Sequence, residues 1–488
     1  MKTTIDVSTK LTRMIQTRAV LLLVTTSVIP LPAQVLTTLH SFDGSDGSNP
    51  GEALVQALNG GLYGVAPFGG VDNQGTLFRI TPSGNFAILK FCAQNDCADE
   101  TPSAPLIQGT RGDLYGTADT AIFKTTPDGA TTTVYAFDDI CPTNEGYLEP
   151  GLSCGIMESQ DGNFYGTIPG AGIRNKLTEC FDGGPCGAIM KITPEGTVSI
   201  VYEFCPSPFF CGDGWAPTAP LVQTSDGTLY GITLYGGEQC YSNGCGTVFQ
   251  LTQNRTPTTL HSFCVDNNSC PDGAFPIALI LGTDGDLYGL TSDQHGTVFK
   301  ITTAGVLTTL HTFDGTDGSF PVGLLQARNG NFYGTTEAGG AYSSGTVFEM
   351  TPGGSLTTLY SFCSAGSTCP DGSAPYGGLV QNTDGNFYGT TSMGGASNDG
   401  TVFKLSVDLA PFVMTLLTAG EVGERVEILG TNLSGSTSVT FNGTAASFSV
   451  ISKSLIVATI PAGASSGEIQ VITPAGKLSS KSAYIVLP

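Results

Sequence analysis

The stretch Asp384-Gly-Asn-Phe-Tyr-Gly-Thr390 contains a Tyr-Gly pair that occurs seven times in this chain of 488 residues. The pairs lie 45 to 65 residues apart and begin at Tyr63, Tyr115, Tyr165, Tyr230, Tyr288, Tyr333 and Tyr388. This spacing is about the length of a four-stranded propeller blade, and seven blades are enough to close a ring. The repeat therefore predicts an all-β chain that folds as a seven-bladed β-propeller over residues 34–406.

Four strands are predicted in each unit, and the last full copy illustrates them. They cover residues 357–362, 378–381, 384–390 and 400–405, separated by segments rich in Gly, Pro, Asn and Asp. Alternating apolar and polar side chains in the first and last segments indicate half-buried strands. Asp-Gly and Thr-Pro-x-Gly turns connect neighbouring strands, so the strands should pair antiparallel.

The order of these segments predicts how the ring closes. The TTLHSF and GTVF segments each occur seven times, but the array starts with TTLHSF at residues 36–42 and stops with GTVFKL at residues 400–405. Pairing these two segments completes the seventh blade. It also removes two open sheet edges, which would otherwise invite aggregation.

Glycine weakens the interior of a strand, yet it follows the tyrosine in every copy. We expect that a close approach by a neighbouring blade, or a β-bulge, requires this glycine. The repeated tyrosine itself is predicted to be structural, because a functional role would need seven equivalent sites.

Residues 1–33 have the pattern of an export signal peptide. Four basic residues precede an apolar segment, residues 19–29, which ends near the small residue Ala33. This segment is too short to span a membrane and is interrupted by Thr25. The mature chain is therefore predicted to be secreted or displayed at the cell surface, with no membrane span.

Fourteen cysteines fall into seven close pairs, with none left over. Pairs behind an export signal predict disulfides rather than zinc sites, because their intervals do not match paired C-x-x-C motifs and the chain has only four histidines. Each bridge closes a short loop and should stabilise the chain by about 1 to 3 kcal/mol. The predicted pairs are Cys92–Cys97, Cys141–Cys154, Cys180–Cys186, Cys205–Cys211, Cys240–Cys245, Cys264–Cys270 and Cys363–Cys369.

The charge of the chain limits its partners. The formal net charge at pH 7 is −22, and 12% of the residues are charged. Nucleic acids and anionic membrane surfaces need clustered Lys and Arg, so neither is an expected partner. We expect a monomer that binds an extracellular glycan or a surface protein without a cofactor.

Successive loops between antiparallel strands alternate between the two ends of a blade. The short turns share one end, and the long loops, which carry every cysteine, share the other. Loops on a rigid scaffold are where binding usually occurs, and aromatic rings among Asn, Asp and Thr suit stacking on sugars. The candidate ligand-binding residues are Phe68, Phe209, Phe210, Trp215, Tyr235 and Tyr342.

No catalytic residue is predicted. His295 precedes a GTVF strand and has no second partner nearby in the sequence. The other three histidines share one strand position, which the remaining copies fill with Lys or Tyr, so they are interchangeable; they are His40, His261 and His311.

Two Asp-rich loops, Asp43–Gly47 and Asp314–Gly318, offer oxygen ligands for calcium. They lack the ligand count of a complete calcium loop, so turn chemistry is favoured and no metal is expected. The alternative to a binding or structural module is a carbohydrate-active hydrolase or lyase with two carboxylates at the propeller mouth.

Residues 36–405 resemble the GloVer tandem repeats of exported bacterial proteins. The units DGNFYGTT…GG…GTVFKL and TTLYSF…DG…P…GLVQ carry the likeness. The second and fifth copies lack the glycine-pair loop, and the third replaces it with residues 168–187. The resemblance implies a secreted or surface protein of propeller-like architecture, a group whose biochemical role is generally unassigned.

Residues 409–488 are similar to an IPT/TIG immunoglobulin-like domain. The likeness rests on Gly420–Leu433, Ser438–Gly443, Ile456–Gly463 and Gly467–Val471. Alternating strands between glycine turns, without cysteine, predict a small β-sandwich. The resemblance implies a spacer or adhesion module.

Overall fold

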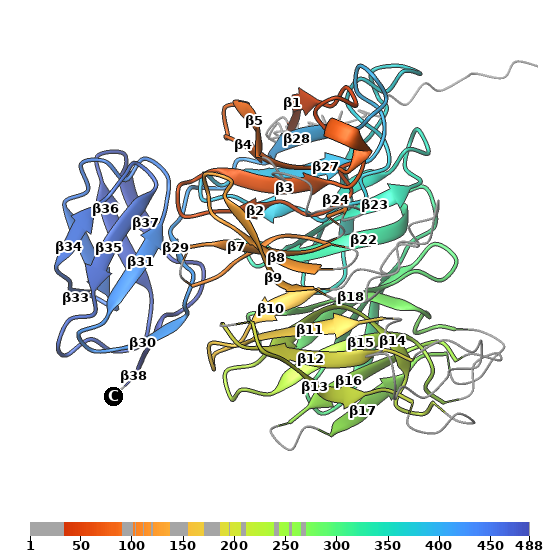
Figure 1. Ribbon diagram of the computed structural model, residues 1–488, viewed down its shortest axis with the longest axis horizontal. Helices are drawn as coiled ribbons and strands as arrows, with labels where there is room; N and C mark the ends of the chain where they lie inside the picture. Colours follow the sequence, from red (N-terminus) through yellow and green to blue (C-terminus); the bar gives the residue numbers. More distant parts are fainter. Residues whose placement is uncertain are drawn as a thin grey trace, which may run out of the picture. The chain divides into compact units, whose positions relative to one another are not determined.

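Each copy of the repeat forms a four-stranded antiparallel sheet (Figure 1). The computed structural model describes residues 34–487 apart from 90–100, 103, 111, 119–120, 137–154, 170–185, 195, 206–210, 239–243, 253–255 and 265–269. Within the described residues, seven such sheets lie between Val35 and Ser406, numbered here sheets 1 to 7 in chain order. The predicted signal peptide, residues 1–33, lies outside the described residues.

The first strand of each unit lies at the edge that contacts the neighbouring sheets, and the second strand pairs with it. The first strands are β2 (Val55–Gln56), β6 (Ile107–Gln108), β10 (Ile156–Glu158), β14 (Trp215–Gln223), β18 (Pro276–Leu281), β22 (Ser319–Gln326) and β26 (Val380–Gln381). The second strands are β3 (Leu62–Ala66), β7 (Leu114–Ala118), β11 (Phe164–Ile168), β15 (Leu229–Tyr235), β19 (Leu287–Thr291), β23 (Phe332–Ala338) and β27 (Phe387–Thr391).

The third and fourth strands complete each sheet on its outer side. The third strands are β4 (Thr76–Ile80), β8 (Ala121–Thr125), β12 (Ala188–Ile192), β16 (Thr247–Leu251), β20 (Thr297–Ile301), β24 (Thr346–Met350) and β28 (Thr401–Ser406). The fourth strands of sheets 1 to 6 are β5 (Phe86–Leu89), β9 (Thr131–Ala136), β13 (Val198–Glu203), β17 (Pro257–Ser262), β21 (Leu307–Thr312) and β25 (Leu356–Ser361).

The outer strand of sheet 7 comes from the start of the array. Strand β1 (Val35–Ser41) pairs antiparallel with β28, and the sheet has the order β1-β28-β27-β26. Leu36 lies opposite Leu405, and Phe42 N donates a hydrogen bond to Gly400 O (3.0 Å). The predicted pairing of residues 36–42 with residues 400–405 is confirmed.

The glycine after the tyrosine lies beneath the phenylalanine of the third strand in six sheets, and beneath Met190 in sheet 3. Gly389 pairs with Phe403, and a Cβ at Gly389 would lie 2.6 Å from Phe403 Cζ, closer than two carbon atoms approach. The prediction that a neighbouring blade or a bulge requires this glycine was wrong, because the crowding ring belongs to the same sheet. Equivalent glycine contacts with the third-strand phenylalanine occur at Gly64, Gly116, Gly231, Gly289 and Gly334.

A second glycine, the first residue of the GTVF motif, packs against a proline of the following sheet. Gly400 has a φ of +93°, a left-handed conformation that favours glycine. A Cβ at Gly400 would lie 2.7 Å from Pro50 Cδ of sheet 1. The equivalent pairs are Gly187 with Pro217, Gly246 with Pro276, Gly296 with Pro321, and Gly345 with Pro375.

A glutamine at the end of the first strand bonds to the preceding sheet. Gln56 Oε1 accepts a hydrogen bond from Thr383 N (3.0 Å), and Gln56 Nε2 donates to Thr383 Oγ1 (2.9 Å), so sheet 7 is bonded to sheet 1. Sheet 5 has Leu281 in place of this glutamine. Its bond to sheet 4 is a backbone bond, in which Phe275 N donates to Cys245 O. At the other junctions a backbone N–H of one sheet donates to the side-chain oxygen at this position of the next sheet, which is a glutamate in sheet 3. These bonds are Leu58 N to Gln108, Thr110 N to Glu158, Gln160 N to Gln223, Thr283 N to Gln326, and Arg328 N to Gln381.

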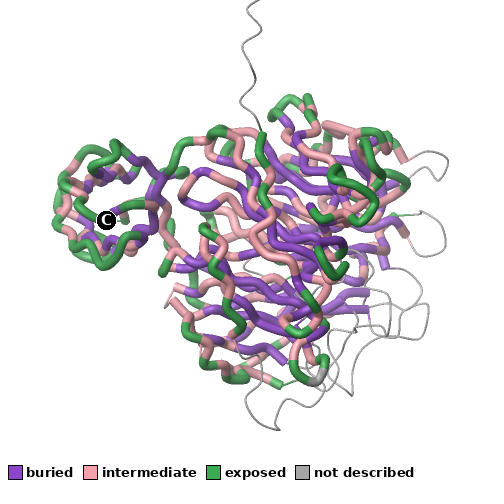
Figure 2. The backbone as a smooth tube through the Cα atoms, turned by 90° about the horizontal axis from the view of Figure 1, so that it is seen from above, coloured by how far each residue is buried: buried purple, intermediate pink, exposed green. Residues whose placement is uncertain are grey.

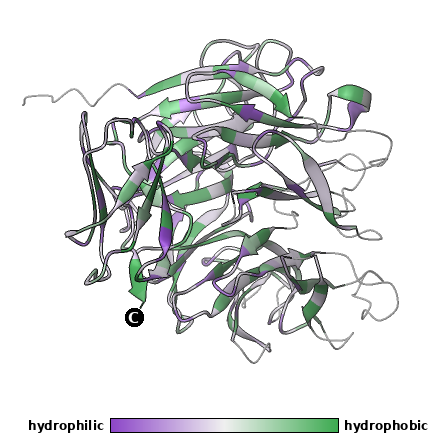
Figure 3. Cartoon of the chain, turned by 60° about the vertical axis from the view of Figure 1, so that its left-hand side comes forward, coloured by the Kyte–Doolittle hydropathy of each residue, from purple (hydrophilic) through white to green (hydrophobic). Residues whose placement is uncertain are grey.

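The sheets bury their apolar side chains between one another. Many of the buried residues lie in the strands of residues 35–406 (Figure 2), and many of the strand residues are hydrophobic (Figure 3). The phenylalanine after the fourth strand meets the third-strand phenylalanine of the following sheet edge to face, as in Phe263–Phe299 and Phe362–Phe403, with ring centroids 5.2 Å apart in both pairs. Each such aromatic pair is worth about 0.5 to 1.5 kcal/mol beyond the area it buries.

Residues 414–487 form three further sheets around a separate apolar core that includes Val439, Phe441 and Ile456. One sheet has the order β29 (Met414–Thr415), β31 (Arg425–Leu429), β35 (Leu455–Thr459), β34 (Phe448–Val450). A second has the order β33 (Thr444–Ala445), β32 (Ser438–Phe441), β36 (Ile469–Thr473), β37 (Gly476–Ser479). Strands β30 (Ala419–Glu421) and β38 (Ile485–Leu487) form a parallel pair, and the one helix among the described residues is the 3-10 turn η1 (Val71–Asn73).

Substitution of Gly389 by alanine tests the contact with Phe403. The added methyl group should displace the ring and reduce the free energy of unfolding by about 1 to 3 kcal/mol. Urea unfolding followed by fluorescence of Trp215, the single tryptophan, would measure this change within the sheets. Gly353→Ala is the matched control, because a Cβ there meets nothing nearer than Thr351 Oγ1 at 3.9 Å. Equal stability of the two variants would contradict the proposed contact.

Candidate functional site

The long loops lie at one end of the sheets, where each first strand begins and each second strand ends. Trp215 pairs with Tyr235 at this end of sheet 4, and Ser319 pairs with Ala338 at this end of sheet 6. We call this the long-loop end. The opposite end, where the Asp-Gly turns lie, contacts the C-terminal residues: Phe412 N donates to Thr383 O (3.0 Å), and Ser454 Oγ donates to Leu58 O (3.4 Å).

Disulfides stiffen the long-loop end. The predicted bridges Cys205–Cys211, Cys264–Cys270 and Cys363–Cys369 are confirmed. Cys186 and Cys245 are also disulfide-bonded, to partners outside the described residues, and none of the described cysteines is free. The remaining cysteines of the predicted pairs lie outside the described residues: Cys92, Cys97, Cys141, Cys154, Cys180 and Cys240.

Two of the candidate aromatic residues form a cluster with a third ring that the sequence did not single out. The rings of Trp215 and Tyr235 stack with centroids 4.4 Å apart and an interplanar angle of 27°. Tyr235 also meets Phe275 of the next sheet edge to face, at 5.7 Å. All three side chains are partly exposed. The cluster therefore presents apolar ring surface to solvent at the junction of sheets 4 and 5.

Phe275 and Phe320 are aromatic residues that sequence reasoning missed. Each precedes the junction proline of its sheet and has a positive φ, 57° and 54° respectively. The Phe320 ring is 40% exposed, and Phe320 N donates to His295 O of the preceding sheet (3.1 Å). The sequence offered one signal for these residues: only two copies carry an aromatic residue before this proline. The other described copies carry Asn49, Ala216 and Ala374 at this position.

The remaining candidates are dispersed. Phe68 is 41% exposed and pairs through its backbone with Ser48, and Tyr342 is 53% exposed. Neither ring contacts another aromatic ring in the described part of the chain. Met393, which takes the place of Phe68 in sheet 7, is 51% exposed. Phe209 and Phe210 lie outside the described residues.

The histidines of the outer strands are bonded to aspartates of the loops. His40 Nε2 lies 2.7 Å from Asp46 Oδ2, whose second oxygen accepts Asp43 N (3.0 Å). A tyrosine does the same in sheet 6, where Tyr360 donates to Asp371 (2.7 Å). This confirms the interpretation that the position is interchangeable and shows that its role is to fix the loop. The equivalent pairs are His261–Asp272, His311–Asp317 and Tyr202–Asp213.

The Asp-rich loops use their carboxylates in these local bonds. No group of three or more potential metal-ligating residues occurs within the described ranges.

Among the described residues, no helix is long and apolar enough to cross a membrane. His295 Nδ1 lies 3.2 Å from Ser319 Oγ, beside the exposed Phe320.

One carboxyl group differs from the other acidic side chains. Glu52 precedes β2, in a position that sheet 7 fills with Gly377, and its backbone carbonyl accepts a hydrogen bond from Thr390 Oγ1 (3.1 Å). Burial raises the pKa of Glu52 to about 8, and its carboxyl group has no hydrogen-bond or ionic partner in the described structure. Burial also raises the pKa of Glu337, in β23. A raised pKa of this kind favours the protonated form of Glu52.

The Gloeobacter/Verrucomicrobia repeat model matches residues 28–181, 122–294 and 242–448 of this chain. The chain belongs to this repeat family. The resemblance predicted over residues 36–405 is confirmed. The matches of this Gloeobacter/Verrucomicrobia repeat protein also extend past the last sheet, into the C-terminal residues. No curated protein matches the chain.

Several solved structures are similar to this repeat protein at low identity. The extracellular domain of the one-component system BT4673 from B. thetaiotaomicron has 11% identity and a TM-score of 0.47, covering 93% of this chain and 59% of that one. A fungal alcohol oxidase of the AA5 family, in complex with copper, has 11% identity and a TM-score of 0.49, covering 93% and 99%. This chain spans little more than half the length of the first of these matches.

Replacement of Glu52 by glutamine should remove a pH-dependent loss of stability. The folded pKa of about 8 lies above the ordinary value of 4.5, so the folded chain keeps a proton that the unfolded chain releases. Stability therefore falls as the pH rises from about 4.5 to 8. The melting temperature, followed by circular dichroism across this range, should decline less in Glu52→Gln than in the native chain. Parallel profiles would contradict the burial of this carboxyl group; Glu238→Gln, at an exposed position, is the control.

Proposed function

We propose that the chain is an exported, non-enzymatic binding module that binds a glycan at its long-loop end. The observation that carries this proposal is the partly exposed cluster of Trp215, Tyr235 and Phe275. Flat aromatic surface suits the apolar face of a sugar ring, and Asp, Asn, Ser and Thr in the same loops offer hydrogen bonds to its hydroxyl groups. Phe320 and Tyr342, in the same long loops of sheet 6, are also exposed.

We also propose that the seven sheets form a closed propeller, followed by an IPT/TIG-like sandwich over residues 409–488. The bonds between Gln56 and Thr383 and the Gly400–Pro50 contact support closure, since they repeat between sheets 7 and 1 the contacts of the other junctions. The two four-stranded sheets of the C-terminal residues, which share one core, support the sandwich.

The two ends of the sheets support a division of roles. The C-terminal residues contact the end with the short turns, through Thr383 and Leu58. The long-loop end carries the disulfides and the unrepeated aromatic residues, and rigid loops lower the entropic cost of binding. The disulfides also support export, because reducing compartments do not maintain them.

A glycan array probed with residues 34–488 would test the proposal. Bound glycans should remain chemically unchanged, and the variant Phe275→Ala, which removes one ring of the cluster, should bind them roughly tenfold more weakly, a loss of about 1.4 kcal/mol. Two other copies carry alanine at the equivalent position, Ala216 and Ala374, so the folded state should stay intact.

Val306→Ala is the matched control for this experiment. Val306 is 63% exposed in the turn before β21, at the end away from the long loops, and its truncation should not change binding. Failure to bind any glycan, or equal binding by Phe275→Ala and the native chain, would overturn the glycan proposal. Capture of a surface protein instead would identify a different ligand class.

A second candidate function, glycoside hydrolysis or lyase chemistry, is favoured by one feature, the pKa of Glu52, which burial raises to about 8. Such chemistry also needs a second carboxylate or a base across the substrate, and burial raises the pKa of another described acid, Glu337. Release of reducing ends or unsaturated products, abolished in Glu52→Gln but not in Glu238→Gln, would favour the enzyme. Glycan binding that both variants retain without products would reject it.

A further inference from the structure

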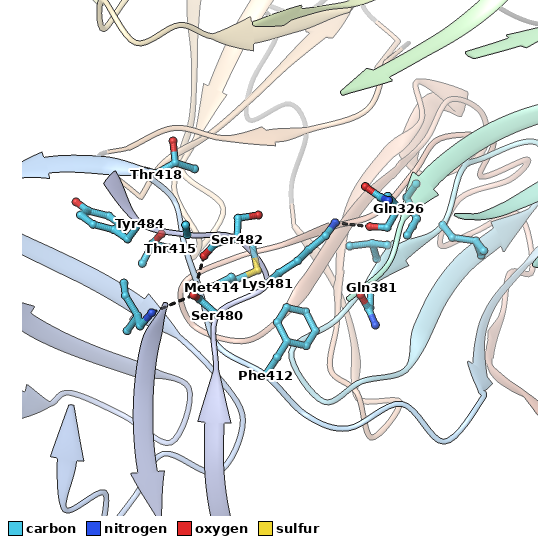
Figure 4. Close-up of a pocket in the computed structure, with 15 residues that line it drawn as sticks. Gln326, Gln381, Phe412, Met414, Thr415, Thr418, Ser480, Lys481, Ser482 and Tyr484 are labelled. Atoms are coloured by element: carbon cyan, nitrogen blue, oxygen red, sulfur yellow. Dashed lines mark hydrogen bonds between the residues drawn. The ribbon is translucent and has the colours of Figure 1, made fainter. Parts of the chain in front are cut away.

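A cavity of about 320 Å³ lies between the first strands of sheets 6 and 7 and the C-terminal residues (Figure 4). Its apolar walls come from Leu325 and Leu379 on one side and from Phe412, Met414 and Ile469 on the other. The volume is at the lower end of the range of small-molecule sites, which is about 300 to 1,000 Å³. The cavity is therefore large enough for a small organic ligand.

The cavity contains a cation without an anion. The Lys481 ammonium group points across the opening toward sheet 6 and donates a hydrogen bond to Gln326 O (Figure 4). Neither Asp nor Glu occurs among the described residues that line the cavity, and Lys481 has no carboxylate partner in the described chain. An ammonium group has three donors, so two N–H groups remain for another acceptor.

The surroundings of Lys481 disfavour its charged form. Lys481 is exposed to solvent, yet desolvation of its ammonium group by the surrounding residues lowers its pKa below the usual value for lysine. A bound anion would offset this cost, because an opposite charge at short distance favours the protonated form.

A second donor in the same cavity also lacks an acceptor. Gln381 Oε1 accepts a hydrogen bond from Arg328 N (3.0 Å), which fixes the orientation of the amide. Gln381 Nε2 is then buried with no hydrogen-bond partner among the described residues. A buried unpaired donor costs about 1 to 3 kcal/mol. Two surplus donor groups beside apolar walls favour a ligand that supplies an acceptor.

We propose that this cavity binds a small organic carboxylate, with its carboxyl group at Lys481 and its hydrocarbon part against Phe412, Met414 and Leu379. The carboxylate would accept the free N–H groups of the ammonium. The hydrocarbon part would fill apolar space that would otherwise hold poorly bonded water. This site is separate from the long-loop end and does not depend on the glycan proposal.

Isothermal titration of residues 34–488 with octanoate would test the proposal. We expect one octanoate to bind per chain, and octanamide, its neutral counterpart, to bind roughly tenfold or more weakly because it cannot form the ion pair. Octanoate affinity should also fall at alkaline pH, as Lys481 loses its proton. No binding of octanoate, or equal binding of octanoate and octanamide, would overturn the proposal without any variant being needed.

The variant Lys481→Met keeps the apolar stem and removes the charge. It should weaken octanoate binding roughly tenfold or more, whereas Lys477→Met, at an exposed lysine in β37 that does not line the cavity, should bind octanoate like the native chain. Unchanged binding in Lys481→Met would contradict the role of this lysine. The variant Phe275→Ala should still bind octanoate, so failure of this site and failure of the glycan site are distinguishable.

Discussion

The contact between the glycine of the second strand and the phenylalanine of the third strand governs the repeat. Because Gly389 has no side chain, the Phe403 ring lies directly over the neighbouring strand, and from there it meets Phe362 of the preceding sheet edge to face. The glycine–phenylalanine contact recurs in six of the seven sheets, so packing within and between the sheets is specified by glycine as much as by the aromatic rings. Substitution of the glycine would displace a ring on which the rest of the core packs.

Junctions between sheets depend on a second set of repeated residues. Proline meets the GTVF glycine, and the first-strand glutamine satisfies a backbone N–H of the preceding turn, as Gln56 does for Thr383. These contacts are made by the glycine, the proline, the glutamine and a backbone N–H group. The side chain before the proline takes no part in them, so it can differ from sheet to sheet. In sheets 5 and 6 that residue is aromatic, which is why Phe275 and Phe320 appear at the long-loop end.

The two ends of the sheets thus offer different chemistry. Disulfides and exposed aromatic rings at the long-loop end give a rigid, partly apolar surface suited to a sugar. At the other end, the C-terminal residues enclose apolar space and bring Lys481 against Gln326 O. Burial lowers the pKa of Lys481 and raises the pKa of Glu52, and a charged neighbour causes neither shift.

The sequence by itself determined the strands, their antiparallel order, the pairing of residues 36–42 with residues 400–405, and the local disulfides such as Cys363–Cys369. These features depend on short-range periodicity, turn residues and the counting of repeats. Only the tertiary structure decided that the Phe403 ring requires Gly389, that Phe275 joins Trp215 and Tyr235, and that Lys481 faces a cavity without an anion. Those outcomes depend on side-chain directions and on contacts between segments distant in the sequence, for which strand periodicity carries no information.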